Sequence, residues 1–387
     1  MIIEGVVRTK GKIHVTSALD EATKINSAGQ INSPDARIPL SRIYRTPAFT
    51  SNGRIEIPFI PANSWVGALR RAVTSAMAES LIARNEQITR TTYRGLSCGA
   101  ADAKPEVGSL LVDEFESYLK HPFIGLFGGG KRLYESGYKI FDMIPIMQAT
   151  VDAGMVPADY ADQVVLLSGG DNVKMASRVS AIDIIHRRDD LLEGRASEEI
   201  VASISDYDEL KSDMYQEVAR KTQAAALRAG VKKADDEKTE SRASMSQQSG
   251  REYISPGVPM YFKTVLKKRV TDEQFGVFLL GLMEVLNTNE FGGASHLGFG
   301  ELNLADAANN LTLHESDRSA PLFELEMRHG KEYLVYCHPK AIACVKMAKD
   351  WMAGVVNSDL ENFYVASTPT QPKARKKAAQ EESAQGE

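Results

Sequence analysis

The sequence has few cysteines, no long apolar run and none of the common nucleotide-binding signatures. Three cysteines, Cys98, Cys337 and Cys344, occur in 387 residues, too few and too scattered for a disulfide framework or a four-ligand zinc site. Cys337 and Cys344 flank His338, but a helix beginning at Pro339 explains this spacing better than a metal site. No apolar stretch reaches the length of a membrane span, and the N-terminus has no signal core. We therefore expect a cytoplasmic protein with no membrane partner, no metal and no cofactor.

The composition is that of a globular protein with an uneven distribution of charge. Hydrophobic residues make up 43% and charged residues 25% of the chain, enough for one large or two moderate cores. The net charge is −5, but residues 189–240 alone hold 14 acidic and 8 basic side chains, so the remainder carries +1. Residues 1–80 hold ten Lys or Arg against six Asp or Glu. A local basic groove for an anionic partner is therefore compatible with the acidic total.

A glycine-rich stretch, FGGASHLGFG at residues 291–300, separates a helical pattern from a strand pattern. Apolar residues recur at helical spacing before it and alternate with polar ones after it, at residues 301–304. Glycine lacks a Cβ, so such a backbone can approach a phosphate closely and direct N–H groups toward it. The stretch has neither the Gly-Lys-Ser/Thr of a P-loop nor the strand-to-helix position of a dinucleotide fingerprint. Two interpretations therefore stand at this point, an anion-binding loop and an ordinary turn.

The N-terminal region predicts two strands separated by a long polar segment. Residues 2–16 are rich in β-branched side chains and predict a first strand. The polar residues 17–52 are too many for a plain connection, so we expect a functional loop there. Residues 55–60 predict a short second strand.

An apolar stripe that begins at Trp65 predicts a helix with a core-facing side. Asn63 and Ser64 precede the stripe and can cap the helix. Arg70 and Arg71 fall off the stripe, in the second turn. Anion binding near the helix N-terminus and simple solvent exposure both account for two such arginines.

The remainder of the chain alternates ordered patterns with polar stretches. Residues 85–112 predict a loop, and residues 128–132, GGGKR, a second cationic loop. Helices are expected at residues 113–120 and 340–352, and strands at 138–151, 164–168, 174–188, 253–266 and 332–337. The strongly polar insertion predicts one helical run, at residues 208–229.

Four segments, in order, resemble the motifs of the RAMP superfamily of CRISPR-associated proteins. They are PFIPANSWVGALRRAV at residues 58–73, HPFIGLFGGG at 121–130, SRVSAIDIIHRR at 177–188 with EYISPGVPMYF at 252–262, and GGASHLGFGELNL at 292–304. The first is similar to the segment that opens the first helix of that family, and the last to its terminal Gly-rich loop. Because the four occur in the right order, their combination is far more specific than any one of them. The acidic insertion, Trp65 and the LFGGGKR form look most similar to type IV backbone subunits, with type III next.

The resemblance implies an α+β fold, a modified ferredoxin-like (RRM-like) palm with a protruding thumb β-hairpin and a partly helical insertion. The implied domains are the palm with its thumb at residues 1–188 and 251–366, and a charged helical or mobile insertion at 189–250. A low-complexity, disordered tail is expected at 367–387.

The resemblance further implies a backbone subunit of a multi-subunit CRISPR effector in antiviral and anti-plasmid defence. Such a subunit binds guide RNA along its phosphates, which leaves the bases free to pair with target DNA or RNA. Copies oligomerise head-to-tail, because a contact that does not close on itself produces a helical filament. The implied partners are the guide RNA, further copies, the target, a large subunit, a guide-capping RAMP subunit, a guide-processing ribonuclease and a helicase.

The residues assigned to RNA binding by the resemblance and by local charge lie in four groups. They are Asn63, Ser64, Arg70 and Arg71 at the first helix; Lys131 and Arg132, from charge alone; Arg178, Arg187 and Arg188 in the thumb; and Gly292, Gly293, Ser295, His296 and Phe299 in the Gly-rich loop. Phe299 could stack on a base or lie in the core beneath the loop.

Two alternatives to a purely structural RNA-binding subunit remain open. The type III likeness implies cleavage of target RNA by an acidic residue after the first strand, with Asp35 or Asp20 as candidates. The sequences around them, SALDEA and SPDARIPLSR, depart from the type III pattern, and no acidic or histidine partner is obvious nearby. A small-molecule nucleotide site at the Gly-rich loop would lack the phosphate-binding lysine. We therefore favour a binding subunit over an enzyme.

Overall fold

The computed structural model describes most of the chain, in ranges separated by gaps. The described residues are 1–17, 23–31, 33–34, 36–51, 53–99, 112–164, 179–187, 197–205, 247–288, 290–304, 311–316, 318–328 and 331–364. The chain divides into two compact units. The main unit comprises Met1–Ala18, Ile43–Ala181 and Tyr253–Glu387, and the second unit comprises Leu19–Arg42 and Ile182–Glu252.

An antiparallel sheet forms the centre of the main unit. Its strands are β1 (Ile2–Thr9), β6 (Tyr138–Ile140), β7 (Ile144–Pro145), β10 (Pro259–Leu266), β11 (Leu302–Leu304), β12 (Thr312–His314) and β13 (Ser319–Pro321). The order is β13-β12-β1-β10-β6, with β11 also paired to β1 and β7 to β10. In the central pair, Val6 lies opposite Tyr261. Both central strands are buried almost throughout, as hydrophobic strands covered by other elements should be.

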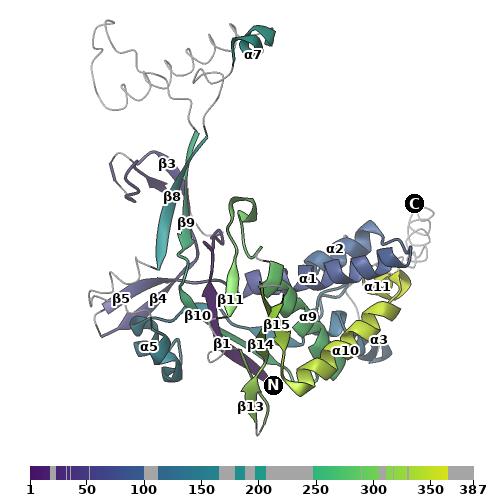
Figure 1. Ribbon diagram of the computed structural model, residues 1–387. Coiled ribbons are helices and arrows are strands. Elements are labelled where there is room, and N and C mark those ends of the chain that lie inside the picture. Colours follow the sequence, from purple (N-terminus) through teal and green to yellow (C-terminus); the bar gives the residue numbers. More distant parts are fainter. Residues whose placement is uncertain are drawn as a thin grey trace, which may run out of the picture. The chain divides into compact units, whose positions relative to one another are not determined.

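Three helices pack together beside this sheet (Figure 1). They are α1 (Ala62–Ala83), α9 (Asp272–Thr288) and α10 (Pro339–Gly354), and α9 contacts both of the others. The fully buried Trp65 of α1 meets the ring of Phe262 of β10 at 4.9 Å. Along the chain, β1, α1, β6, β10, α9 and β11 follow a β-α-β-β-α-β order. The molecule is therefore an α+β protein.

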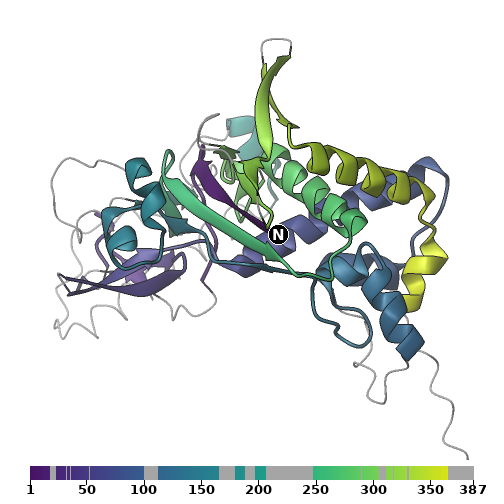
Figure 2. The same cartoon turned by 90° about the horizontal axis from the view of Figure 1, so that it is seen from below.

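Smaller elements complete the main unit (Figures 1 and 2). The helical ones are α2 (Arg90–Cys98), α3 (Val112–Lys120), α4 (Ile124–Phe127), α5 (Gln148–Asp152), η1 (Ala158–Gln163), η2 (Ser295–Leu297) and α11 (Asn357–Tyr364). Two hairpins are formed by β4 (Arg45–Thr50) with β5 (Gly53–Pro58), and by β14 (Phe323–Arg328) with β15 (Lys331–Tyr336). In the described part of the chain, no helix is both long and apolar enough to span a membrane.

The second unit is a small mixed sheet with its own core. The sheet order is β2 (Lys24–Ile25), β3 (Ile38–Ser41), β9 (Gln247–Ile254) and β8 (Ser180–Arg187), and a short helix, α7 (Glu198–Ser203), lies in the same part of the chain. β3 pairs with β9 in parallel. A cluster of Ile25, Ile38 and Leu40 forms its apolar centre. The described residues 23–31 and 36–41 of the polar segment therefore share one sheet with β8 and β9, which flank the charged insertion.

Several of the predicted elements are present, and others differ from the prediction. The helices expected near residues 113–120 and 340–352 and the strand near 332–337 are present as α3, α10 and β15. Residues 85–112, expected as a loop, contain α2, which is capped at its start by the Thr89 side chain. The expected strand at 138–151 is broken and ends in α5. Residues 165–168 and the helical run at 208–229 lie outside the described residues.

Candidate nucleic-acid interface

The first turn of α1 is capped differently from the sequence prediction. Its N-cap is Pro61, and Asn63 and Ser64 lie inside the helix. The Ala62 amide donates instead to Oδ1 of Asp142 at 2.7 Å. A carboxylate therefore already occupies the positive end of this helix. Any anion bound here would be held by side chains more than by the free amides.

One exposed side of α1 carries a polar residue, a glycine and an arginine at helical spacing. Asn63, Gly67 and Arg71 follow one another at intervals of four residues, and Asn63 and Arg71 are exposed. A Cβ at Gly67 would lie 3.1 Å from Nη1 of Arg71, so the guanidinium lies over the glycine. Helical side chains point toward the N-terminus, which explains this direction. Arg71 is thereby held toward the first turn, where Asn63 and Ser64 lie.

Arg70, the neighbouring candidate, is buried and serves the fold. It is 6% exposed, and its guanidinium donates to the carbonyl oxygens of Leu96 at 3.3 Å, Phe127 at 2.7 Å and Gly128 at 3.0 Å. Its charge also lies over the rings of Phe123 and Phe127. We therefore leave Arg70 out of the candidate interface.

The Gly-rich loop is a folded structure with an exposed outer side. Its base is fixed to residues after β1: Gly293 N–H donates to the His14 carbonyl at 2.8 Å, and Gly300 N–H to the Lys12 carbonyl at 2.9 Å. Gly292 has φ +86°, and a Cβ there would lie 2.7 Å from the His14 oxygen. Any other residue at this position would therefore strain the backbone and clash.

The outer side of the loop presents the residues predicted for RNA contact. Gly292, Gly293, Ser295 and His296 are all exposed. Ser295 and His296 lie in η2, and the first N–H groups of such a turn have no intrahelical acceptor. The loop joins α9 to β11, the helix-to-strand position predicted from the sequence.

The first turn of α1 and the Gly-rich loop are anchored to each other. Phe291, at the start of the loop, places its ring 4.7 Å from the ring of Trp65. Both side chains are buried, Trp65 completely. Two segments that are more than 200 residues apart in the sequence therefore share one anchor. Trp65, expected in the core, is confirmed there.

Phe299 is buried beneath the Gly-rich loop. It is 4% exposed, its ring lies edge-on to Tyr253 at 5.8 Å, and Lys12 Nζ lies 5.6 Å from its centroid. Of the two roles considered for Phe299, stacking on a base or lying in the core, the structure shows the core position. Its buried ring is not accessible to a base. Lys12 and His14, which the sequence analysis did not single out as RNA contacts, form the floor of the loop.

The second glycine loop, residues 128–132, packs against other segments of the protein. Gly128, Gly129 and Gly130 all have positive φ. A Cβ at Gly129 would overlap the Gly99 backbone, and the Lys131 amide donates to the Phe363 carbonyl at 2.8 Å. Glycine is needed here for close contact between segments.

The two basic side chains of this loop are engaged within the protein. Lys131 and Arg132 are 15% and 17% exposed and lie 3.7 and 3.2 Å from Oε1 of Glu114. We therefore leave them out of the interface as well.

The thumb and catalytic candidates fall largely on residues that the structure does not describe. Arg178, Arg188, Asp20 and Asp35 lie outside the described ranges. Arg187 is the last residue of β8. Among the described residues, no group of three or more His, Cys, Asp or Glu could hold a metal ion.

The site and the fold together define an α+β protein with an exposed glycine loop anchored to the start of a helix. No protein-family model matches the sequence, and no curated protein matches it. Among solved structures, a chain described as "Type IV-B CRISPR Complex" is 14% identical, covers 82% of this chain and 93% of its own, and has a TM-score of 0.41. A similarity of this degree assigns no function, which therefore rests on the chain's own residues.

Proposed function

We propose that this protein is a backbone subunit of a type IV-like CRISPR effector that binds guide RNA without cutting it. The main unit would be its ferredoxin-like palm. The strand order β11-β1-β10-β6, with α1 and α9 in the connections between strands, supports this. β8 and β9 would form the thumb. Copies would associate head-to-tail along the RNA and present it to a DNA or RNA target. A large subunit, a guide-capping RAMP subunit, a processing ribonuclease and a helicase would complete the complex.

The observation that carries the proposal is the Trp65–Phe291 contact. The resemblance assigned the helix start and the Gly-rich loop to RNA independently of any structure, and this contact joins them. Agreement between sequence pattern and packing supports a shared role. RNA would be held by Asn63, Ser64 and Arg71 on one side and by the exposed loop residues on the other.

The chemistry of these groups suits a phosphate chain better than a base sequence. Arginine and backbone N–H groups bind phosphate oxygens, and such contacts position RNA without reading it. A guide subunit must accept any spacer, so sequence-independent contact is what the function requires.

Gly293 offers a test that separates charge from shape. It lacks a positive φ, and a Cβ there would meet only ordinary contacts, at 3.6 Å from the His14 oxygen. Gly293→Asp therefore adds a negative charge beside the RNA at little cost to the fold, and Gly293→Asn adds the same volume without charge. We expect the Asp variant to weaken binding of a short single-stranded RNA about tenfold or more, equivalent to about 1.4 kcal/mol, and the Asn variant by much less.

Fluorescence anisotropy with labelled RNA at fixed salt measures this difference, with thermal unfolding as the check on folding. Equal affinities for wild type and both variants would remove the Gly-rich loop from the interface. Failure of the wild type to bind any RNA would overturn the proposed function.

A further inference from the structure

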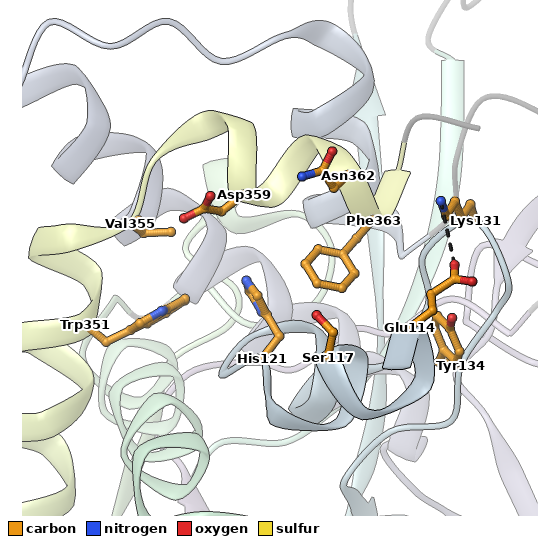
Figure 3. A pocket seen from close by; sticks show the side chains of 10 residues that line it. All are labelled: Glu114, Ser117, His121, Lys131, Tyr134, Trp351, Val355, Asp359, Asn362 and Phe363. Carbon is orange, nitrogen blue, oxygen red and sulfur yellow. Dashed lines mark ion pairs between the residues drawn. The ribbon is translucent and has the colours of Figure 1, made fainter. Parts of the chain in front are cut away.

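A pocket lies between α3, α10 and α11, at one end of the main unit. Its volume is about 610 Å³, within the roughly 300–1,000 Å³ of clefts that hold small ligands. Figure 3 shows Trp351 from α10, and Asp359 and Phe363 from α11, on one side, and Ser117 and His121 on the other. The His121 ring is edge-on to Trp351 at 5.7 Å and to Phe363 at 4.8 Å.

The lining combines the rings of Tyr134, Trp351 and Phe363 with polar side chains, among them the carboxylates of Glu114 and Asp359. Glu114, at the far side, is matched by Lys131 and Arg132. Asp359 makes no ion pair with any described residue. Burial lowers the pKa of His121 to about 4, so the imidazole is neutral near pH 7 and does not repel a cation. Aromatic faces with a nearby carboxylate favour a group that is apolar and positively charged.

The hairpin of β4 and β5 presents such a group. Phe49 is 73% exposed, and it lies directly opposite Arg54 in the register of the two strands, so both side chains stand on one face. Arg54 is paired to Glu56 at 2.6 Å, but both are exposed, and such surface pairs contribute little. An exposed phenylalanine beside an arginine is typical of residues that anchor protein interfaces.

This hairpin and the pocket lie at opposite ends of the main unit. Figures 1 and 2 show β4 and β5 on one side of the central sheet and α3, α10 and α11 on the other. The hairpin therefore cannot reach the pocket of its own chain, but that of a second copy can. A contact between two different surfaces of the same molecule repeats head-to-tail.

We infer that the pocket of one copy receives Phe49 and Arg54 of the next, with Phe49 against Trp351 and Phe363 and the Arg54 guanidinium on Asp359. The inference rests on the proposed function for its head-to-tail geometry and names the surfaces that make the contact. The pocket is thus a protein-binding site for an aromatic and basic hairpin tip of a second copy.

A charge-reversal cycle tests this contact. Self-association of wild type, R54E, D359R and the double variant is measured by analytical ultracentrifugation, with and without a long single-stranded RNA. Each single variant should weaken association at least tenfold, and the double variant should recover much of the loss. F49S, a change at an exposed position, should weaken it similarly. K346A, which alters an exposed charge elsewhere on α10, is the matched control and should behave as wild type.

Binding of a short RNA separates this inference from the proposed function. Variants that bind short RNA normally but fail to assemble on long RNA would support the contact. The contact would be overturned if R54E, D359R and F49S associate as strongly as wild type. It would also be overturned if the double variant associates no more strongly than the weaker of the two single charge-reversal variants. A wild type that binds short RNA yet stays monomeric at high concentration and on long RNA would overturn the inference and the head-to-tail association, but not RNA binding. A wild type that self-associates yet binds no RNA would overturn the proposed function alone.

Discussion

Arg70 and Arg71 are adjacent in sequence but have different surroundings. Arg71 is exposed and lies over Gly67, whereas Arg70 is buried among carbonyl groups of α2 and the second glycine loop. Because a helix turns by 100° per residue, one step moves a side chain from solvent into the core. The sequence pattern could place both arginines off the apolar stripe. It could not show that three carbonyl groups from distant segments accept hydrogen bonds from Arg70.

Replacement of each arginine should therefore affect a different property. Arg70→Ala leaves three buried carbonyls without a donor and should lower the free energy of unfolding by about 2–4 kcal/mol. Arg71→Ala should change the free energy of unfolding by less than about 0.5 kcal/mol. It should weaken RNA binding and lower the slope of log affinity against log salt concentration by about the amount expected for one phosphate contact. Urea unfolding and RNA titrations at several salt concentrations measure the two effects. Equal loss of stability in both variants would contradict the assignment.

His121 should make stability depend on pH. Its Nδ1 accepts hydrogen bonds from the amides of Phe123 and Ile124 at 3.2 and 3.1 Å, at the start of α4, and burial lowers its pKa from 6.5 to about 4. Between these values the unfolded chain binds the proton more readily than the native one, so stability rises with pH. The contribution is complete above pH 6.5 and is lost as pH falls toward 4.

The variant His121→Asn keeps a side-chain acceptor for these amides and removes the titration. Urea unfolding at pH 7.5 and 5 should show wild type losing more stability than this variant on acidification. A constant difference between the two proteins across this range would contradict the role of His121.

At the scale of elements, α9 depends on glycines for its contacts with both neighbouring helices. A Cβ at Gly276 would overlap the Cys344 carbonyl of α10, and one at Gly281 would lie 2.9 Å from Val73 of α1. Helix propensity alone would favour alanine at these positions. The close approach of backbones therefore decides the residue, against local preference.

Gly276→Ala should destabilise the protein by about 1–3 kcal/mol, because the added methyl group pushes α10 away from α9. Gly354→Ala, at the end of α10 with open space around its Cβ, is the matched control and should be close to neutral. Thermal unfolding compares them. A Gly276→Ala protein as stable as the control would show that the two helices are not packed as described.

The elements that the sequence predicted well are those with strong apolar periodicity. The apolar stripe that begins at Trp65 correctly predicted α1. The change from helical to alternating apolar spacing around the Gly-rich loop correctly predicted α9 and β11. α2 was missed because its sequence, RTTYRGLSC, has poor intrinsic preference for a helix. Tertiary contact stabilises it, since Gly95 packs directly against Tyr364 of α11. No local signal could have revealed that distant partner.

The candidate interface was predictable in part for similar reasons. Glycine content pointed to the loop at residues 291–300. Four of the five residues named there, Gly292, Gly293, Ser295 and His296, are exposed, whereas Phe299 is buried. Glycines at 128–130 gave the same sequence signal but pack against Gly99 and Phe363. The two loops differ in solvent exposure, which depends on contacts with elements far away in the sequence and not on the local residues.

At the scale of the whole molecule, the division into two units matches the distribution of charge. The second unit comprises Leu19–Arg42 and Ile182–Glu252, and the acidic residues 189–240 fall within the second of these sequence ranges. The main unit, which holds the candidate interface, lies outside that acidic segment. An acidic total charge is therefore no obstacle to an RNA-binding main unit.

The central claim, that copies of this protein assemble on a guide RNA, is tested most directly by co-expression with a repeat-spacer transcript. The purified particle is analysed for its absorbance ratio and its mass, with transcripts of two lengths. We predict an RNA-bearing particle whose mass increases with transcript length by whole subunits, and which Gly293→Asp weakens more than Gly293→Asn. A nucleic-acid-free monomer from every transcript would contradict the account.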